Sequence, residues 1–210
     1  RTSPGGQIVV ICSSTPGEGK STLSLNLAHA AVGAGLRTLL IDADLRRGTI
    51  GQRLGIPADT AGLADYLRDA ADWRRHVVPA PGLGFSVMTC GTNPSALIDH
   101  LMLKLPTALT VETRAEYDMV VIDSAPIIPV SDTIPFLSRV DRVVFVVRLR
   151  NALITTSLKA LQVLKRSSGR DPLLVETFAR PGVDELPDLF RSIRQLRVAL
   201  RDLDDLRAAR

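Results

Sequence analysis

Near its start the chain contains the glycine-rich segment Ser13-Ser14-Thr15-Pro16-Gly17-Glu18-Gly19-Lys20-Ser21-Thr22. The preceding run QIVVIC, residues 7–12, predicts a buried strand, and the following run LSLNLAHAA, residues 23–31, predicts a helix. A strand, a glycine-rich loop, Gly-Lys-Ser and a helix in this order predict a phosphate-binding loop. Glycines let backbone N–H groups turn toward a phosphate, and the helix N-terminus adds the positive end of its dipole.

Two side chains extend this interpretation to a nucleotide. Lys20 is placed to reach the β- and γ-phosphates, and Ser21 can bind Mg²⁺ through its hydroxyl. Ser14 stands where the usual motif has its first glycine, which is a departure from that motif. The alternative is an ordinary glycine-rich turn between a strand and a helix, and the Lys-Ser pair in this context argues against it. The stretch therefore indicates a nucleotide site.

The composition fits one α/β domain with an aliphatic core, because 45% of the 210 residues are hydrophobic and only 4% are aromatic. The net charge of +4 is spread along the chain, so we expect no specific nucleic-acid partner. Cys12 and Cys90 form no CxxC pair and are expected to be structural thiols of a reducing compartment. No apolar run approaches about 18 residues, so we expect no membrane span here. The chain begins with Arg1, which suggests a piece of a longer polypeptide.

Acidic residues follow two further apolar runs. Residues 36–42 predict a strand of a parallel βαβ unit, and Asp42 and Asp44 stand at its end. Residues 118–123 predict another strand, which ends at Asp123. Because the carboxyl ends of parallel strands meet at one edge of a sheet, these acids are expected to face the phosphates. A single acid at a strand end is common on a surface, but three at two strand ends downstream of a phosphate loop indicate a Mg²⁺ site.

The remaining pattern continues the alternation of strands and helices. Residues 48–62 are rich in turn signals, and residues 69–81 are predicted to form a surface connection that carries Trp73, Arg74 and Arg75. The further predicted elements are helices at 63–68, from 93 to about 105, at 107–116, near 133–138 and at 152–165, and strands at 83–90, 142–148 and 173–178.

Leucines recur at three- and four-residue steps from residue 186 to the end of the chain, which predicts an amphipathic helix. The sequence is therefore divided into a P-loop domain, residues 1–183, and a C-terminal helix, residues 184–210. This helix either packs on the same domain or binds a partner. The expected fold is that of a P-loop NTPase, with a mostly parallel central sheet sandwiched by helices.

The motifs resemble those of a known family, the bacterial tyrosine kinases of capsule and exopolysaccharide synthesis. Three stretches carry the resemblance: the phosphate loop (Walker A), LLIDADLR at residues 39–46 (Walker A′) and VVIDSAP at residues 120–126 (Walker B). The similarity covers about residues 7–165. Partition and septum-site ATPases are similar too, but they carry a second lysine in the loop. Thr15 stands at that position here, as it does in the kinases.

The resemblance implies ATP and Mg²⁺ as ligands and assigns roles to individual residues. Lys20 and the loop backbone would hold the β- and γ-phosphates, while Ser21, Asp44 and Asp123 would bind Mg²⁺ directly or through water. Asp42 would act as base near the attacking hydroxyl, so the implied catalytic set is Lys20, Asp42, Asp44 and Asp123. The nucleotide-binding residues it implies are Thr15, Pro16, Gly17, Glu18, Gly19, Lys20, Ser21, Thr22 and Arg46.

The chain departs from the family in its acceptor and adenine positions. Family members carry clustered tyrosines in a C-terminal tail, whereas the tyrosines here are Tyr66 and Tyr117. An asparagine that contacts adenine in relatives has no counterpart in residues 175–178. The glutamate- and arginine-containing helix that supports the family's ring assembly would lie before Arg1.

The sequence favours the first of three functions and leaves the other two as alternatives, the third being the weaker. The first is an autophosphorylating protein-tyrosine kinase domain that regulates exopolysaccharide or capsule synthesis and chain length. The second is an ATP-binding assembly module, and the third is a partition-type ATPase. The implied partners are a polysaccharide chain-length (co-polymerase) membrane protein, or a fused membrane domain, and further copies in a homo-oligomer. The implied location is the cytoplasmic face of the plasma membrane.

Overall fold

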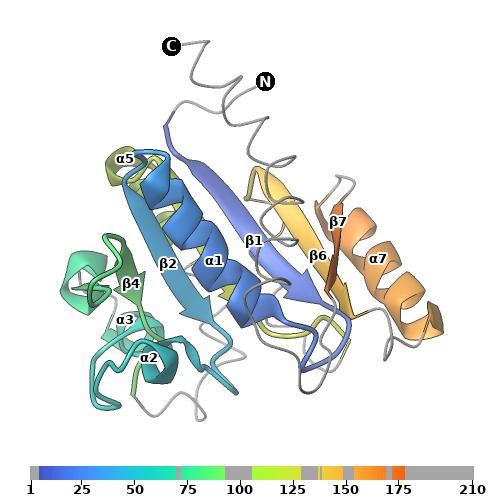
Figure 1. Cartoon of the computed structure of the whole chain (residues 1–210), viewed down its shortest axis with the longest axis horizontal. Helices are drawn as coiled ribbons and strands as arrows, with labels where there is room; N and C mark the ends of the chain where they lie inside the picture. Colours follow the sequence, from blue (N-terminus) through green and yellow to red (C-terminus); the bar gives the residue numbers. More distant parts are fainter. Residues whose placement is uncertain are drawn as a thin grey trace.

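The computed structural model describes residues 5–69, 72–92, 106–128, 137, 139–148, 154–168 and 172–177. Within them lies one seven-stranded sheet with the order β3-β4-β2-β5-β1-β6-β7 (Figure 1). Only the pair β3 and β4 is antiparallel. The strands are β1 (Gln7–Ser13), β2 (Thr38–Ala43), β3 (Val78–Pro79), β4 (Ser86–Met88), β5 (Met119–Ser124), β6 (Arg142–Arg148) and β7 (Leu173–Thr177).

The helices connect these strands and cover both faces of the sheet (Figure 1). α1 packs on β1, β2 and β5, while α3 contacts β2, α5 contacts β1 and β5, and α7 contacts β6. The expected P-loop architecture, a mostly parallel sheet between helices, is thereby confirmed. The helices are α1 (Lys20–Gly33), α2 (Ile50–Arg53), α3 (Leu63–Asp69), α5 (Pro106–Glu116) and α7 (Ile154–Ser168), with a 3₁₀ turn η1 (Trp73–His76).

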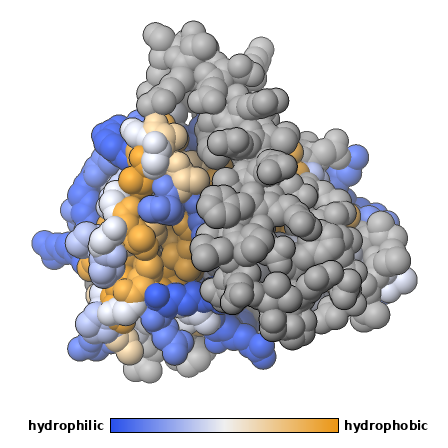
Figure 2. Space-filling model, viewed as in Figure 1, coloured by the Kyte–Doolittle hydropathy of each residue, from blue (hydrophilic) through white to orange (hydrophobic). Residues whose placement is uncertain are grey.

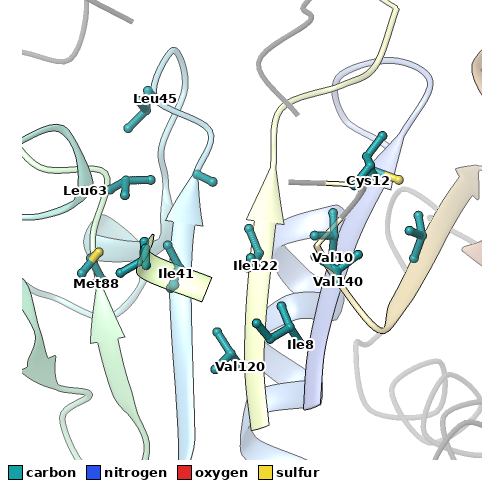
Figure 3. Close-up of a cluster of buried hydrophobic side chains, with 14 of the residues drawn as sticks. Ile8, Val10, Cys12, Ile41, Leu45, Leu63, Met88, Val120, Ile122 and Val140 are labelled. Atoms are coloured by element: carbon teal, nitrogen blue, oxygen red, sulfur yellow. The ribbon is translucent and has the colours of Figure 1, made fainter. Parts of the chain in front are cut away.

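Alternate residues of the central strands point to opposite faces, so each strand supplies two cores. On one face Ile8, Val10, Val120 and Ile122 pack together in an aliphatic cluster (Figure 3). On the other face Val9, Ile11 and Val121 pack with Leu23 and Leu27 of α1. Continuous apolar strands are what a parallel sheet covered on both faces requires.

The surface view shows the described part of one face of the molecule. Apolar residues gather there in a band bordered by hydrophilic residues (Figure 2). Leu25 and Val32 of α1 are partly buried and pack against the core cluster on the α1 side of the sheet.

In the part of the chain that the structure describes, no helix combines the length and the hydropathy needed to span a bilayer.

The prediction for residues 69–81 is wrong at Trp73. This side chain was expected on a surface connection, but it is 1% exposed and belongs to the main core cluster. The polar neighbours that suggested exposure remain outside: Asp72 caps the 3₁₀ turn by accepting from the Arg74 N–H, and the Arg74 guanidinium lies 4.7 Å above the indole ring. Arg74 thus covers the ring while keeping its own charge in water.

Two other segments differ in extent from their predictions. The turn-rich residues 48–62 contain the short helix α2, and the strand predicted at 83–90 is reduced to Ser86–Met88. The turn before β4 contains Gly82 and Gly84, both with positive φ, which delays the start of the strand. The helix predicted from 93 to 105, almost all of 133–138, and the C-terminal helix at 184–210 lie outside the described residues.

Candidate nucleotide site

The predicted phosphate loop and acids meet at one edge of the sheet. β5 lies between β1 and β2, so the ends of these three strands are neighbours. Asp42 on β2 is in register with Asp123 on β5, which in turn pairs with Ile11 two residues before the end of β1. The adjacency of Asp42 and Asp123 follows from the parallel pairing of β2 and β5.

The loop has the backbone that a phosphate requires. Gly17 and Gly19 have φ of 80° and 97°, conformations that a residue with a Cβ rarely adopts. α1 begins at Lys20, and no side chain caps its first turn. Its N–H groups and the positive end of its dipole are therefore available to an anion. In the first turn of α1 Lys20 is buried, whereas Thr22 is exposed.

The loop residues divide into those that face other loop groups and those at the surface. Pro16 is exposed and Thr15 is half-buried. Glu18 is buried, and its carboxylate accepts hydrogen bonds from the Ser14 hydroxyl and the Thr15 N–H. Arg46, also predicted as a nucleotide ligand, lies exposed in the turn after β2.

Asp42 is a fully buried carboxylate at the end of β2. Burial raises its pKa to about 7, and the neighbouring charge of Asp123 acts in the same direction. The N–H groups of Asp44 and Ile50 donate to the carboxylate at 3.3 and 3.0 Å. These bonds fix the orientation of the carboxylate without removing the cost of burying its charge. A carboxylate with a pKa near neutrality is suited to accept a proton.

Asp123 is the second buried acid. Burial raises its pKa to about 6, while a hydrogen bond from Ser21 and the charge of Lys20 counteract the increase. Ser24 donates to Asp123 Oδ1 at 3.0 Å. Asp44 is nearly buried and accepts from the Arg47 N–H at 3.0 Å. The structure thus brings together the acids and the P-loop residues Lys20 and Ser21 that were expected to share a site.

The donor set at this edge fits Mg²⁺. Ser21 and Asp123 interact directly, and Asp44 lies at the end of the neighbouring strand. Hydroxyl and carboxylate oxygens are the ligands that Mg²⁺ prefers, and it commonly completes its shell with water and phosphate oxygens. The charge of Asp123 makes Asp42 harder to ionise, and the charge of Asp44 does the same to Asp123; a cation at this edge would offset both effects.

Some residues around the site were not identified from the sequence. Ser24 follows Lys20 by one helical turn, so the spacing of four residues was a usable signal. Arg53 of α2 donates to the Thr22 hydroxyl at 3.0 Å, a contact between distant segments that has no local signal. Gly48 packs closely against Cys90 and Asp42. A Cβ at this position would lie 2.5 Å from the Cys90 side chain and 3.0 Å from Asp42 Oδ2.

The comparison with known families identifies the class of protein. A sequence profile described as the CobQ/CobB/MinD/ParA nucleotide binding domain matches residues 9–200. The chain therefore belongs to this family of nucleotide-binding domains.

The relatives within this family are bacterial tyrosine kinases, which confirms the resemblance seen in the motifs. The putative tyrosine-protein kinase EpsB of Ralstonia nicotianae is 34% identical over 163 residues, which cover 75% of this chain and 21% of EpsB. Tyrosine-protein kinase YwqD of Bacillus subtilis is 37% identical over 124 residues, which cover 59% of this chain and 52% of YwqD. The chain thus spans between about a fifth and half of the length of these relatives.

Solved structures of kinase domains have the same fold. The kinase domain of the Escherichia coli tyrosine kinase Etk superposes with a TM-score of 0.74 at 25% identity, covering 85% of this chain and 71% of that chain. The VpsO kinase domain gives the same TM-score at 28% identity, covering 83% of this chain and 86% of its own.

Proposed function

We propose that this chain is the catalytic domain of a protein-tyrosine kinase that uses ATP and Mg²⁺ in exopolysaccharide or capsule synthesis. The observation that carries the proposal is the buried pair Asp42 and Asp123 beside Lys20 at the end of the phosphate loop. The names of the relatives support phosphate transfer to tyrosine, since EpsB and YwqD are both named as tyrosine kinases.

The proposed reaction is an in-line transfer of the γ-phosphoryl group to a hydroxyl. Asp42 accepts the proton of the attacking hydroxyl, the new P–O bond forms, and the bond to the leaving ADP oxygen breaks. Lys20 and the loop N–H groups stabilise the charge on the β- and γ-phosphates. Mg²⁺, when bound by Ser21, Asp44 and Asp123, would neutralise phosphate charge. Phosphoryl transfer depends mainly on positioning and charge neutralisation, and these residues supply both.

The acceptor is proposed to be a hydroxyl other than those of Tyr66 and Tyr117. Tyr66 is 4% exposed and packs in the main core cluster. Tyr117 precedes β5, at the opposite end of that strand from Asp123, and its ring packs against Trp73. Neither ring can enter the site of its own chain, and Tyr66 can enter no site while the core is folded.

A second candidate is a nucleotide-operated assembly module in which ATP binding or slow hydrolysis controls association. The buried position of Tyr66 favours it, because among the described residues only the partly exposed Tyr117 remains as a tyrosine acceptor, and it lies at the far end of β5 from Asp123. The partner in either case is proposed to be a polysaccharide chain-length membrane protein or a fused membrane domain, and the location the inner face of the plasma membrane.

One experiment separates these candidates. The chain is incubated with ATP and Mg²⁺, with and without a synthetic tyrosine-containing copolymer, and both phosphotyrosine and ADP are measured. Phosphotyrosine on the copolymer supports the kinase. ADP without phosphotyrosine supports the assembly module, and a chain that neither binds nor turns over ATP would contradict both.

A further inference from the structure

Glu18 is an acid inside a loop that is built to bind anions. Its side chain is nevertheless buried, with the residue 3% exposed. A carboxylate at this place opposes phosphate binding through its charge. The hydrogen bonds that Glu18 makes within the loop indicate a structural role that offsets this unfavourable charge.

The carboxylate of Glu18 closes the first half of the loop upon itself. Oε2 accepts the Thr15 N–H at 2.7 Å and the Ser14 hydroxyl at 2.9 Å, and Oε1 lies 3.1 Å from the same hydroxyl. Hydrogen bonds to an ionised acceptor are short and strong, as the Thr15 bond is. Residues 14 to 18 are therefore held in one conformation by a side chain of the loop itself.

Ser14 connects this closure to α7. Its hydroxyl oxygen lies 3.4 Å from that of Ser157, and both residues are buried. A glycine, the usual residue at position 14, offers neither contact. The departure from the usual motif at Ser14 thus has a structural use, since the serine supplies the hydroxyl that Glu18 binds.

Thr177 connects the loop to β7 from another direction. Its hydroxyl donates to the Glu18 carbonyl oxygen at 2.7 Å. Its side chain also occupies the space beside Gly19, where an added Cβ would lie 3.4 Å from the Thr177 methyl group. Glu18 is therefore held through its side chain by the loop and through its main chain by the last described strand.

We propose that Glu18 is a positioning residue whose side chain holds the phosphate loop in the conformation that binds phosphate. Ser14 links this side chain to α7, and Thr177 links the main chain of Glu18 to β7. The inference rests on the proposed function, because it assigns the loop to the phosphates of ATP. It places the Glu18 side chain among the groups that shape the loop rather than among those that touch the nucleotide.

A positioning role for Glu18 and a simple charge effect predict opposite changes in nucleotide affinity. If the charge of Glu18 were its only influence, Glu18→Ala and Glu18→Gln would both tighten nucleotide binding. If the hydrogen bonds matter, Glu18→Gln keeps an acceptor for the Thr15 N–H, whereas Glu18→Ala leaves that partly buried group without one. The pair of variants therefore distinguishes hydrogen bonding from charge.

The test is titration of a fluorescent ADP analogue, combined with kcat and KM for ATP and with thermal unfolding. We expect Glu18→Ala to raise the Kd for ADP and the KM for ATP by about tenfold or more, the factor that corresponds to one lost charge-assisted hydrogen bond. Glu18→Gln is expected to stay within about threefold of wild type. Thr177→Val, which removes one hydroxyl, is expected to raise both constants by about threefold.

Glu112→Gln serves as the matched control, because Glu112 is an exposed acid on α5. If Glu18→Ala lacks a folded thermal transition, Glu18→Gln and Thr177→Val decide the question. Wild-type affinity in both Glu18→Ala and Thr177→Val would overturn the inference, as would a Glu18→Gln variant as weak as Glu18→Ala. A wild-type chain that binds ADP but transfers no phosphate would remove the proposed function and leave this test intact.

Discussion

Asp65 joins the start of α3 to the segment after β4, and we expect Asp65→Asn to lower the free energy of unfolding. Oδ2 accepts the N–H groups of Gly62 and Thr92, both at 2.9 Å. Oδ1 accepts the Thr92 hydroxyl at 2.5 Å and the Arg68 guanidinium at 3.0 Å. Burial opposes ionisation, but these hydrogen bonds outweigh it and lower the pKa of Asp65 from 3.8 to about 2.

The magnitude follows from this pKa. A decrease of about 1.8 units at about 1.36 kcal/mol per unit gives an upper limit of about 2.4 kcal/mol. Asp65 is partly exposed, so solvent screening reduces the expected loss to about 1–2 kcal/mol. Because the folded-state pKa lies below the unfolded-state value, this contribution is complete above about pH 4 and is lost as the pH falls through about 2.

The assay is urea unfolding followed by the fluorescence of Trp73, the single tryptophan and a buried one. We expect Asp65→Asn to unfold with about 1–2 kcal/mol less free energy at pH 7, and the difference to shrink at pH 3. Asp59→Asn, an exposed acid on the preceding turn, is the control and should match wild type. Equal stabilities of Asp65→Asn and wild type at pH 7, or a difference independent of pH, would show that the ionised Asp65 carboxylate does not stabilise the fold.

Three further predictions concern the site itself. Ser24→Ala removes the donor to Asp123, so we expect turnover of ATP to fall about tenfold in steady-state assays; unchanged turnover would argue against a role for that bond. Gly48→Ala places a methyl group against Cys90 and Asp42, so urea unfolding should show a loss of about 1–3 kcal/mol, and an unaltered midpoint would contradict the close packing. EDTA should abolish turnover while leaving the melting temperature of the nucleotide-free protein unchanged, and metal-independent turnover would exclude the Mg²⁺ site.

The sequence was sufficient for the six parallel strands and for the acids at their carboxyl ends, but it missed the short edge strand β3 (Val78–Pro79), which lies in the segment predicted to be a surface connection. Asp42 and Asp123 could be placed together because parallel strands end at a common edge, whatever the details of packing. The loop from Ser13 to Thr22 could be recognised because a local pattern of glycines, lysine and serine specifies it. The loop was recognised from residues adjacent in the sequence, and the strands from their continuous apolar runs.

The contacts that link distant segments could not be predicted in the same way. The burial of Trp73 depends on α3 and Tyr117 arriving at the same place, while its neighbours Arg74 and Arg75 carry the polar signal of a surface. The hydrogen bond from Thr177 to Glu18 joins residues that are 159 positions apart. Such contacts arise from tertiary packing, for which a single sequence provides no periodic signal.

The proposed function requires Lys20, Asp42 and Asp123 to act together in the transfer of phosphate from ATP to a tyrosine. The most direct measurement is transfer of radiolabelled γ-phosphate to a tyrosine copolymer by wild type, Lys20→Met and Asp42→Asn, with Lys159→Met, an exposed lysine of α7, as the control. We expect transfer by wild type and Lys159→Met, and loss of at least about 100-fold in the other two. Transfer by Lys20→Met at the wild-type rate would contradict a role for Lys20 in holding the phosphates.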